Sequence, residues 1–134
     1  MKLTVKQLIV GSDALKRLGE QGVRVLSYKV FYAVGKNIGH VTKEIDRYNS
    51  EYQRIVSEFS AEQADGTFGV LPKDISKLNS VIEEAQTIVV DIPIMEVKLT
   101  EEIIENAGIR ASDLAALEWM FVLDEAKNDT DTGK

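Results

Sequence analysis

Few side chains in this sequence are of the types that catalyse reactions or bind metals. There is one histidine, His40, and no cysteine, so zinc and redox metals lack the several imidazole or thiolate ligands that they need. His40 lies off the apolar stripe described below and is expected to be exposed. Neither a G-x-x-x-x-G-K-[ST] loop nor a G-x-S-x-G motif is present. A pair of carboxylates that meet only in the fold stays open, but we expect no enzyme, no metal and no cofactor.

A line of basic residues is the most regular charged feature. Its members are separated by 7, 7, 4 and 7 positions, so on a helix they share one face. The line consists of Lys29, Lys36, Lys43, Arg47 and Arg54. Such a line is typical of a solvated face with ion pairs, and the functional alternative is a docking surface for an anionic partner. Because the chain has a net charge of −6 and the line lacks exposed aromatic residues, we do not expect nucleic acid to be that partner.

The element that carries this line is a long helix, predicted from Val23 to Ser60. It contains no proline, and its apolar residues alternate between spacings of three and four, which is typical of a helix packed along another helix. These residues are Ile38, Val41, Ile45, Tyr48, Tyr52, Ile55 and Phe59. The helix would be about 55 Å long at 1.5 Å per residue, which is more than a compact domain of this size needs. Part of it is therefore expected to project or to meet a second copy.

The last four members of the stripe are candidates for self-association as a two-fold dimer. They are Tyr48, Tyr52, Ile55 and Phe59. The shorter helices are not long enough to cover the whole stripe, which favours a partner copy. The alternative is a monomer in which the 61–71 segment and the helix containing Trp119 fold back over it. Gly35-x-x-x-Gly39 inside the helix predicts close approach of another element of the same chain or, alternatively, of a partner.

The remaining segments predict an α+β fold that is mostly helical, with shorter helices and a small β-sheet. Thr4-Val-Lys-Gln7 is a capping box, so a first helix is expected to start there, although a strand over 2–10 is an alternative. The other predicted elements are a strand at 67–71, a helix from Pro72, a strand over 87–99 with a bulge near Ile94, a helix over 101–106, and a last helix capped by Ser112-Asp113 that extends to Phe121. Trp119 in that last helix is interpreted as a core anchor or as part of a partner-binding surface.

The chain of 134 residues is expected to form one domain over 1–123, followed by a disordered polar tail over 124–134. No stretch approaches the roughly 18 consecutive apolar residues of a membrane span. The N-terminal run has no small-residue cleavage site, so we do not expect a signal peptide.

Three short motifs occur in order: Leu3-Thr4-Val5-Lys6, then Val25 to Lys29 with Lys36-Asn37-Ile38, then Asp113 to Met120. In these motifs the chain resembles a family of small uncharacterised phage proteins, often encoded near the tail genes of phages of Gram-positive bacteria. The chain departs from that family's pattern at Arg110-Ala-Ser112 and in the 101–106 segment. The resemblance implies a phage or prophage origin and a location in the host bacterial cytoplasm. It brings no established activity, so no catalytic residue is carried over.

These observations together predict a non-enzymatic interaction factor. It would bind and modulate a host or phage protein, as host-takeover and anti-defence factors do. The candidate partner-binding residues are Lys29, Lys36, Lys43, Arg47, Arg54 and Trp119. The alternative is a component of the phage virion or of tail assembly, such as a chaperone.

Overall fold

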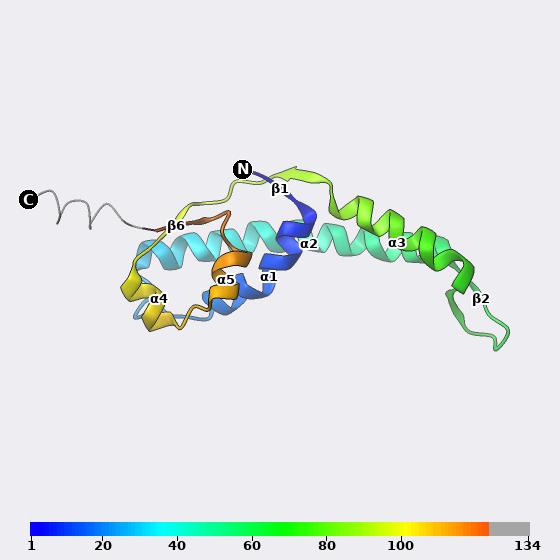
Figure 1. The fold of residues 1–134 in the computed structure, drawn as a ribbon, viewed down its shortest axis with the longest axis horizontal. Coiled ribbons are helices and arrows are strands. Elements are labelled where there is room, and N and C mark those ends of the chain that lie inside the picture. Colours follow the sequence, from blue (N-terminus) through cyan, green and yellow to red (C-terminus); the bar gives the residue numbers. More distant parts are fainter. Residues whose placement is uncertain (124–134) are drawn as a thin grey trace, which may run out of the picture.

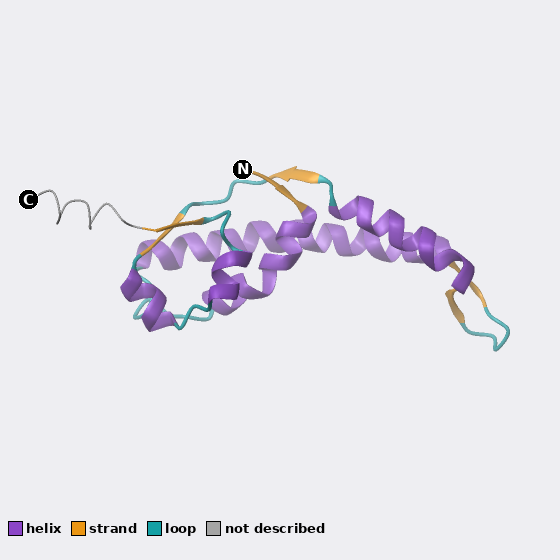
Figure 2. Ribbon diagram, in the orientation of Figure 1, coloured by secondary structure: helices purple, strands orange, loops and turns teal. Residues whose placement is uncertain are grey.

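A computed structural model describes residues 1–123, so the expected disordered tail over 124–134 lies outside the described residues. The fold is α+β and mostly helical, as the sequence predicts (Figure 2). In chain order the elements are β1 (Lys2–Thr4), α1 (Val5–Gly19), α2 (Tyr28–Phe59), β2 (Ser60–Glu62), β3 (Phe68–Val70), α3 (Pro72–Gln86), β4 (Val89–Asp91), β5 (Val97–Leu99), α4 (Glu101–Ala107), α5 (Ala111–Ala116) and β6 (Phe121–Leu123).

The long helix α2 is the spine of the molecule, and the other elements divide into two groups along it (Figure 1). Along its first half, α1 and β5 pack on α2, and α5 packs on α1. Along its second half, α3 runs beside it in the opposite direction, and the β2–β3 hairpin lies at the far end. We call residues 46–86 the arm and the rest of the described chain the head. The second half of α2 therefore projects, as its length predicts.

The apolar core lies in the head. Its fully buried large side chains come from α1, the turn before α2, α2 itself, β5 and the stretch between α5 and β6. They are Leu8, Leu15, Leu26, Val34, Val41, Val97, Leu99, Leu117 and Met120. In the arm, Leu78 is the only buried apolar residue among those described. The two parts of the molecule consequently differ in how much packing supports them.

Helix α2 is continuous through Gly35 and Gly39, but it starts at Tyr28 and not at Val23. Residues 22–26 form a turn in which the Val25 and Leu26 amides donate to the Gly22 carbonyl, and Ser27 caps the helix.

The expected close approach of another element of the chain at Gly35 and Gly39 is wrong. A Cβ atom at Gly35 or at Gly39 would meet no atom within 4 Å.

The strands form three separate two-stranded pairs: β1 with β4 and β2 with β3, both antiparallel, and β5 with β6, parallel. Two predicted elements differ from the structure.

The expected strand over 87–99 is divided into β4 and β5, because the backbone of Met95 bonds to a side chain of α2 instead of to a strand. The last helix begins after Arg110 and ends at Ala116, because Phe121 pairs with Val97 in a parallel ladder that no local signal encodes.

Candidate protein-interaction site

The five residues of the basic line are all exposed and lie on one continuous helix. At 100° per residue they fall within about 40° of one another. Lys29, Lys36 and Lys43 belong to the head, whereas Arg47 and Arg54 belong to the arm. Arg47 pairs with Glu51 one turn later at 3.5 Å, which is an exposed ion pair of small energetic value. His40, which was expected to be exposed, is half-buried.

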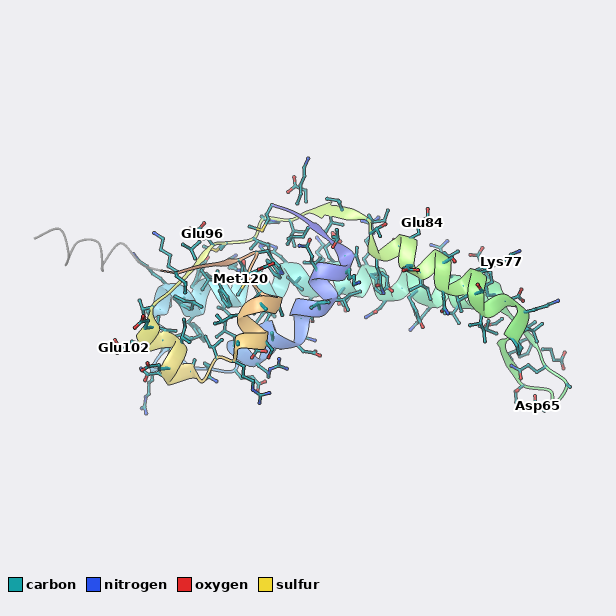
Figure 3. The ribbon with its side chains drawn as sticks, viewed as in Figure 1. Asp65, Lys77, Glu84, Glu96, Glu102 and Met120 are labelled. Atoms are coloured by element: carbon teal, nitrogen blue, oxygen red, sulfur yellow. The ribbon has the colours of Figure 1, made fainter. Side chains whose placement is uncertain are left out.

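The head carries a groove of about 570 Å³ beside the N-terminal turns of α2. The segment leading into β5 and the start of α4 form its other borders; Figure 3 shows Glu96 on that segment and Glu102 on α4. The lining residues are Ser27, Tyr28, Lys29, Val30, Tyr32, Ala33, Met95, Glu96, Val97, Lys98, Thr100 and Ile103. Most of the lining surface that reaches solvent is apolar. A groove of this size and chemistry is suited to an apolar anchor from a partner.

The exposed aromatic residues of this groove follow directly from how α2 begins. Val30 and Ala33 are buried in the head, so Tyr28 and Tyr32, one turn apart, must lie on the outer side of the same helix. The Tyr28 side chain is 68% exposed, and the two ring centroids are 6.2 Å apart. Lys36, one turn further, places its Nζ 5.8 Å from the centroid of the Tyr32 ring, within the range of a cation–π contact. The first turns of α2 thus present a row of two aromatic rings and an ammonium group.

The opposite wall of the groove is held in place by a buried side chain of α2. Asn37 is fully buried, and its Nδ2 donates to the Met95 carbonyl while its Oδ1 accepts from the Met95 amide, each at 2.8 Å. Both polar atoms of the side chain are therefore satisfied, as burial requires. The backbone of Met95 is in this way held against α2, and its exposed side chain lines the same groove as Tyr28 and Tyr32.

Charges of both signs surround the groove. Lys29, Lys98 and Glu96 line the groove. The ammonium group of Lys36 lies next to the groove, over the Tyr32 ring. Elsewhere in the head, the Arg17 guanidinium donates to the Asp113 carboxylate at 2.6 Å and joins α1 to α5, which raises the pKa of Arg17. The groove itself combines apolar surface with exposed charges of both signs, a composition that suits binding of a protein partner.

Trp119 is placed apart from the basic line. It is half-buried against the core, and its Nε1 donates to the Ala116 carbonyl at 3.1 Å. Its ring lies over Gly11 of α1, where an added Cβ would stand 3.1 Å from the ring carbon Cζ2. Trp119 also borders a separate cavity of about 220 Å³ with Val10 and Glu118. The structure therefore does not bring Trp119 together with the five basic residues.

The four candidate self-association residues lie on the arm. Tyr48, Ile55 and Phe59 are half-buried, and Tyr52 is 41% exposed. Helix α3 lies along this stripe, and the Gln86 Nε2 donates to the Tyr48 hydroxyl at 3.0 Å. In the alternative to a dimer, the 61–71 segment and the helix containing Trp119 would cover the stripe. Helix α3 provides the cover along the stripe, β3 of the 61–71 segment contacts α2 as well, and Tyr52 stays exposed.

Sequence reasoning missed three residues that line the groove, Tyr28, Tyr32 and Met95, and the supporting Asn37. A local signal for the first two was present, because two tyrosines one turn apart lay on the face of α2 opposite Val30 and Val34. No local signal pointed to Asn37, whose partner is 58 positions away in the chain.

In residues 1–123, no group of three or more His, Cys, Asp or Glu side chains could hold a metal ion. Within the same range, no helix combines the length and the apolar character needed to cross a membrane. Comparisons of the sequence with protein-family models and with curated proteins, and of the fold with solved structures, find no match.

Proposed function

We propose that this protein is a non-enzymatic, phage-encoded interaction factor that binds a host or phage protein in the host bacterial cytoplasm and alters its activity. The observation that carries this proposal is the groove of the head, where Tyr28, Tyr32 and Met95 leave apolar surface exposed next to Lys29 and Lys98. Aromatic and methionine side chains are enriched at the centres of protein interfaces. Surface lysines around them select a partner with nearby acidic residues.

The preorganisation of the groove supports the same proposal. Ser27 fixes where α2 starts, and Asn37 fixes the Met95 backbone against α2. Neither wall has to become ordered when a partner binds, so less conformational entropy is lost on association. Lys36 and Lys43 continue the basic line beyond the groove, and Arg47 and Arg54 extend it along the arm. They would contact acidic residues of a larger partner.

A pull-down that is sensitive to the groove tests this proposal. Tagged wild-type protein is incubated with lysate of the bacterial host and compared with a Tyr28→Ala/Tyr32→Ala variant. The matched control is Phe68→Ala, which removes an aromatic side chain that is 76% exposed on β3, far from the groove. We expect one stoichiometric partner with the wild type and the control, and its loss with the double variant.

A photo-crosslinker at Tyr32 should attach to that same partner. If the double variant retains the partner, or if the crosslinker attaches to nothing, the groove is not the binding site. If no protein is captured at stoichiometric level from uninfected or infected cells, the proposed function is wrong.

A role as a virion component or as a tail-assembly factor is the second candidate. The observation that favours it is the arm, which projects beyond the head and exposes Tyr52, Phe68 and Ile75. Mass spectrometry of purified particles of the encoding phage separates the two roles. Many copies per particle would support the structural role, whereas absence from particles together with a host partner would support the interaction factor.

A further inference from the structure

Strand β5 has one paired edge and one open edge. On the paired edge the Val97 amide donates to the Met120 carbonyl at 2.8 Å, and β6 continues the parallel ladder. In residues 1–123 no strand pairs with the other edge. Because the N–H and C=O groups of successive residues in an extended strand point to opposite edges, those of Glu96 and Lys98 point away from β6. These four groups have no hydrogen-bond partner in the described part of the chain, so they form an open strand edge.

The open edge of β5 faces the groove of the head. The paired strand β6 lies on the side of α1, since Phe121 borders a cavity together with Leu18 of α1. The open edge is therefore turned away from α1. The groove lies on this side, because residues 95–98 form one of its walls and Tyr28 and Tyr32 belong to the other.

The two flanks of α2 give the same orientation. Asn37 binds the backbone of Met95, and Ile38 and Tyr32 lie about 100° and 140° from Asn37 in opposite directions around the helix. Ile38 lies against α1, since a Cβ atom at Gly19 of α1 would meet its Cδ1 atom. The flank that carries Tyr32 is therefore the one away from α1, next to the open edge of β5.

An extended segment fits along this edge. Residues 95–100 span about 17 Å at 3.3 Å per residue, the length of a typical strand. The Val97 side chain is buried in the head, so the exposed side chain of Lys98 lies on the outer face of the sheet. A strand added next to β5 would alternate in the same way. Every second side chain would lie over Ala33 on the floor of the groove, and the others would lie beside Lys98 and Glu96.

The open edge favours an extended segment over a helix. The N–H and C=O groups of a helix bond to one another within the helix, so a helix in the groove would leave the backbone groups of Glu96 and Lys98 without partners. A strand would bond to them. Recognition of this kind draws its affinity from backbone hydrogen bonds and its specificity from the pockets that receive alternate side chains.

We infer that the groove binds an extended segment of the partner protein, which adds to the open edge of β5 as a further strand. This inference rests on the proposed function, because it takes the groove as the binding site for the partner. The side chains of the segment that face α2 would be apolar, since they meet Tyr28, Tyr32 and Ala33. The outward residue opposite Lys98 would be acidic, because opposite charges in cross-strand pairs stabilise a sheet.

Selection of peptides from a random dodecapeptide library tests the inference without a known partner. The immobilised protein is the chain of 134 residues, and the Tyr28→Ala/Tyr32→Ala variant removes binders of other surfaces. We expect the selected peptides to alternate apolar with polar residues and to carry an acidic residue at one polar position. Apolar residues at spacings of three and four, which are typical of a helix, or a failure to select any peptide that needs the two tyrosines, would overturn the inference.

Methylation of single backbone amides in the strongest peptide tests how it binds. In a strand only every second amide faces β5, so methyl groups on alternate amides should weaken binding about tenfold or more. Methyl groups on the amides between them are the matched controls and should have little effect. Equal effects at successive positions would show that the peptide does not add to β5 as a strand.

A change to the backbone of β5 tests the same contact from the other side. Lys98→Pro removes an N–H that the pairing with β6 does not use, and Lys98→Ala removes the same side chain but keeps this N–H. We expect Lys98→Pro to bind the peptide about tenfold more weakly than Lys98→Ala, with wild-type circular dichroism. Equal affinities of the two variants would contradict the strand.

Amide exchange measured by NMR follows the open edge without any substitution. In the free protein the amides of Glu96 and Lys98 should exchange faster than those of Val97 and Leu99, which face β6. Addition of the peptide should slow exchange at Glu96 and Lys98 in particular. Protection of these two amides in the free protein would show that the edge is already covered and would overturn the inference.

The outcomes separate this inference from the proposed function. A host protein that is lost with Tyr28→Ala/Tyr32→Ala but captured equally by Lys98→Pro and Lys98→Ala would support the proposed function and overturn the strand. Peptides that bind as strands, when no host or phage protein is captured, would support the strand and overturn the proposed function.

Discussion

The side chain of Asn37 binds the backbone of Met95 as a neighbouring strand would. Its amide group donates to the carbonyl and accepts from the N–H of the same residue, each at 2.8 Å. The Asn37 Nδ2 also lies 3.5 Å from the Met120 Sδ. One fully buried side chain thus joins α2 both to the segment between β4 and β5 and to the residue that precedes β6. At Met95, in the segment between β4 and β5, this side chain takes the place of a paired strand.

Replacing Asn37 should therefore destabilise the protein. Asn37→Ala leaves the amide and carbonyl of Met95 without partners in a half-buried place, which costs about 1–3 kcal/mol of unfolding free energy. Urea denaturation measures this loss. Asn49→Ala is the matched control, because Asn49 is an exposed asparagine of the same helix and its loss should change stability by less than about 0.5 kcal/mol. Equal midpoints for the two variants would contradict the role assigned to Asn37.

Gly11 and Gly39 should respond in opposite ways to the same substitution. A Cβ at Gly11 would stand 3.0 Å from the Ala116 carbonyl oxygen and 3.0 Å from Leu117 Cδ2, so Gly11→Ala should destabilise by about 1–3 kcal/mol through overpacking. Gly39 lies in a helix with open space around it, so Gly39→Ala should stabilise by up to about 1 kcal/mol. Thermal and urea denaturation of the two variants provide the comparison.

If Gly39→Ala stabilises the isolated protein but weakens capture of a partner, then the partner packs at this glycine. If Gly39→Ala destabilises the protein, then an unseen contact exists on this face of α2.

Amide hydrogen exchange should distinguish the arm from the head. With Leu78 as its only buried apolar residue among those described, the arm has little apolar packing, and regions of that kind open with a small free energy. Amides of α3 and of α2 after residue 46 should exchange faster than those around Val34 and Val41. Measured at 5 and 500 μM, exchange in the arm should slow at the higher concentration if the arms associate, while exchange in the head should not change. Uniform protection along α2 at both concentrations would contradict the division into head and arm.

The turn of the β2–β3 hairpin contains a carboxylate that titrates below its ordinary range. The Asp65 Oδ1 accepts from the Thr67 hydroxyl at 2.6 Å and from the Thr67 amide at 3.0 Å, and these bonds lower the pKa of Asp65. Because the folded pKa is the lower one, the stabilisation is present above the unfolded pKa of about 3.9 and is lost as pH falls through the folded pKa. Carbon-13 NMR titration should therefore find the Asp65 pKa below that of an exposed aspartate.

Thr67→Val removes the hydroxyl donor but retains the backbone donor. It should raise the pKa of Asp65 part of the way toward its ordinary value, whereas Thr42→Val in α2 should leave it unchanged. An Asp65 pKa that does not respond to Thr67→Val would show that the hydroxyl bond is not formed in solution.

Local signals in the sequence predicted most helix boundaries. The capping box is present, with the Thr4 amide donating to Gln7 Oε1 at 2.8 Å and the Gln7 amide donating to Thr4 Oγ1 at 3.1 Å. Helix α3 starts at Pro72, and α4 starts after Thr100 and ends at Gly108, whose φ is +64°. These boundaries depend on hydrogen bonds between residues three or four positions apart, so the residues that determine them lie next to each other in the sequence.

Contacts between distant positions decided the rest, and with it the candidate site. Met95 lies in the groove because Asn37 binds its backbone from 58 positions away, and Phe121 leaves the last helix because it pairs with Val97. Tyr48 is half-covered because α3 returns along α2 and Gln86 reaches its hydroxyl. The sequence alone determined that α2 is a long, continuous helix with an apolar stripe and a basic line. Which parts of its surface stay exposed was decided by the tertiary structure, because burial depends on where segments far apart in the chain come to lie.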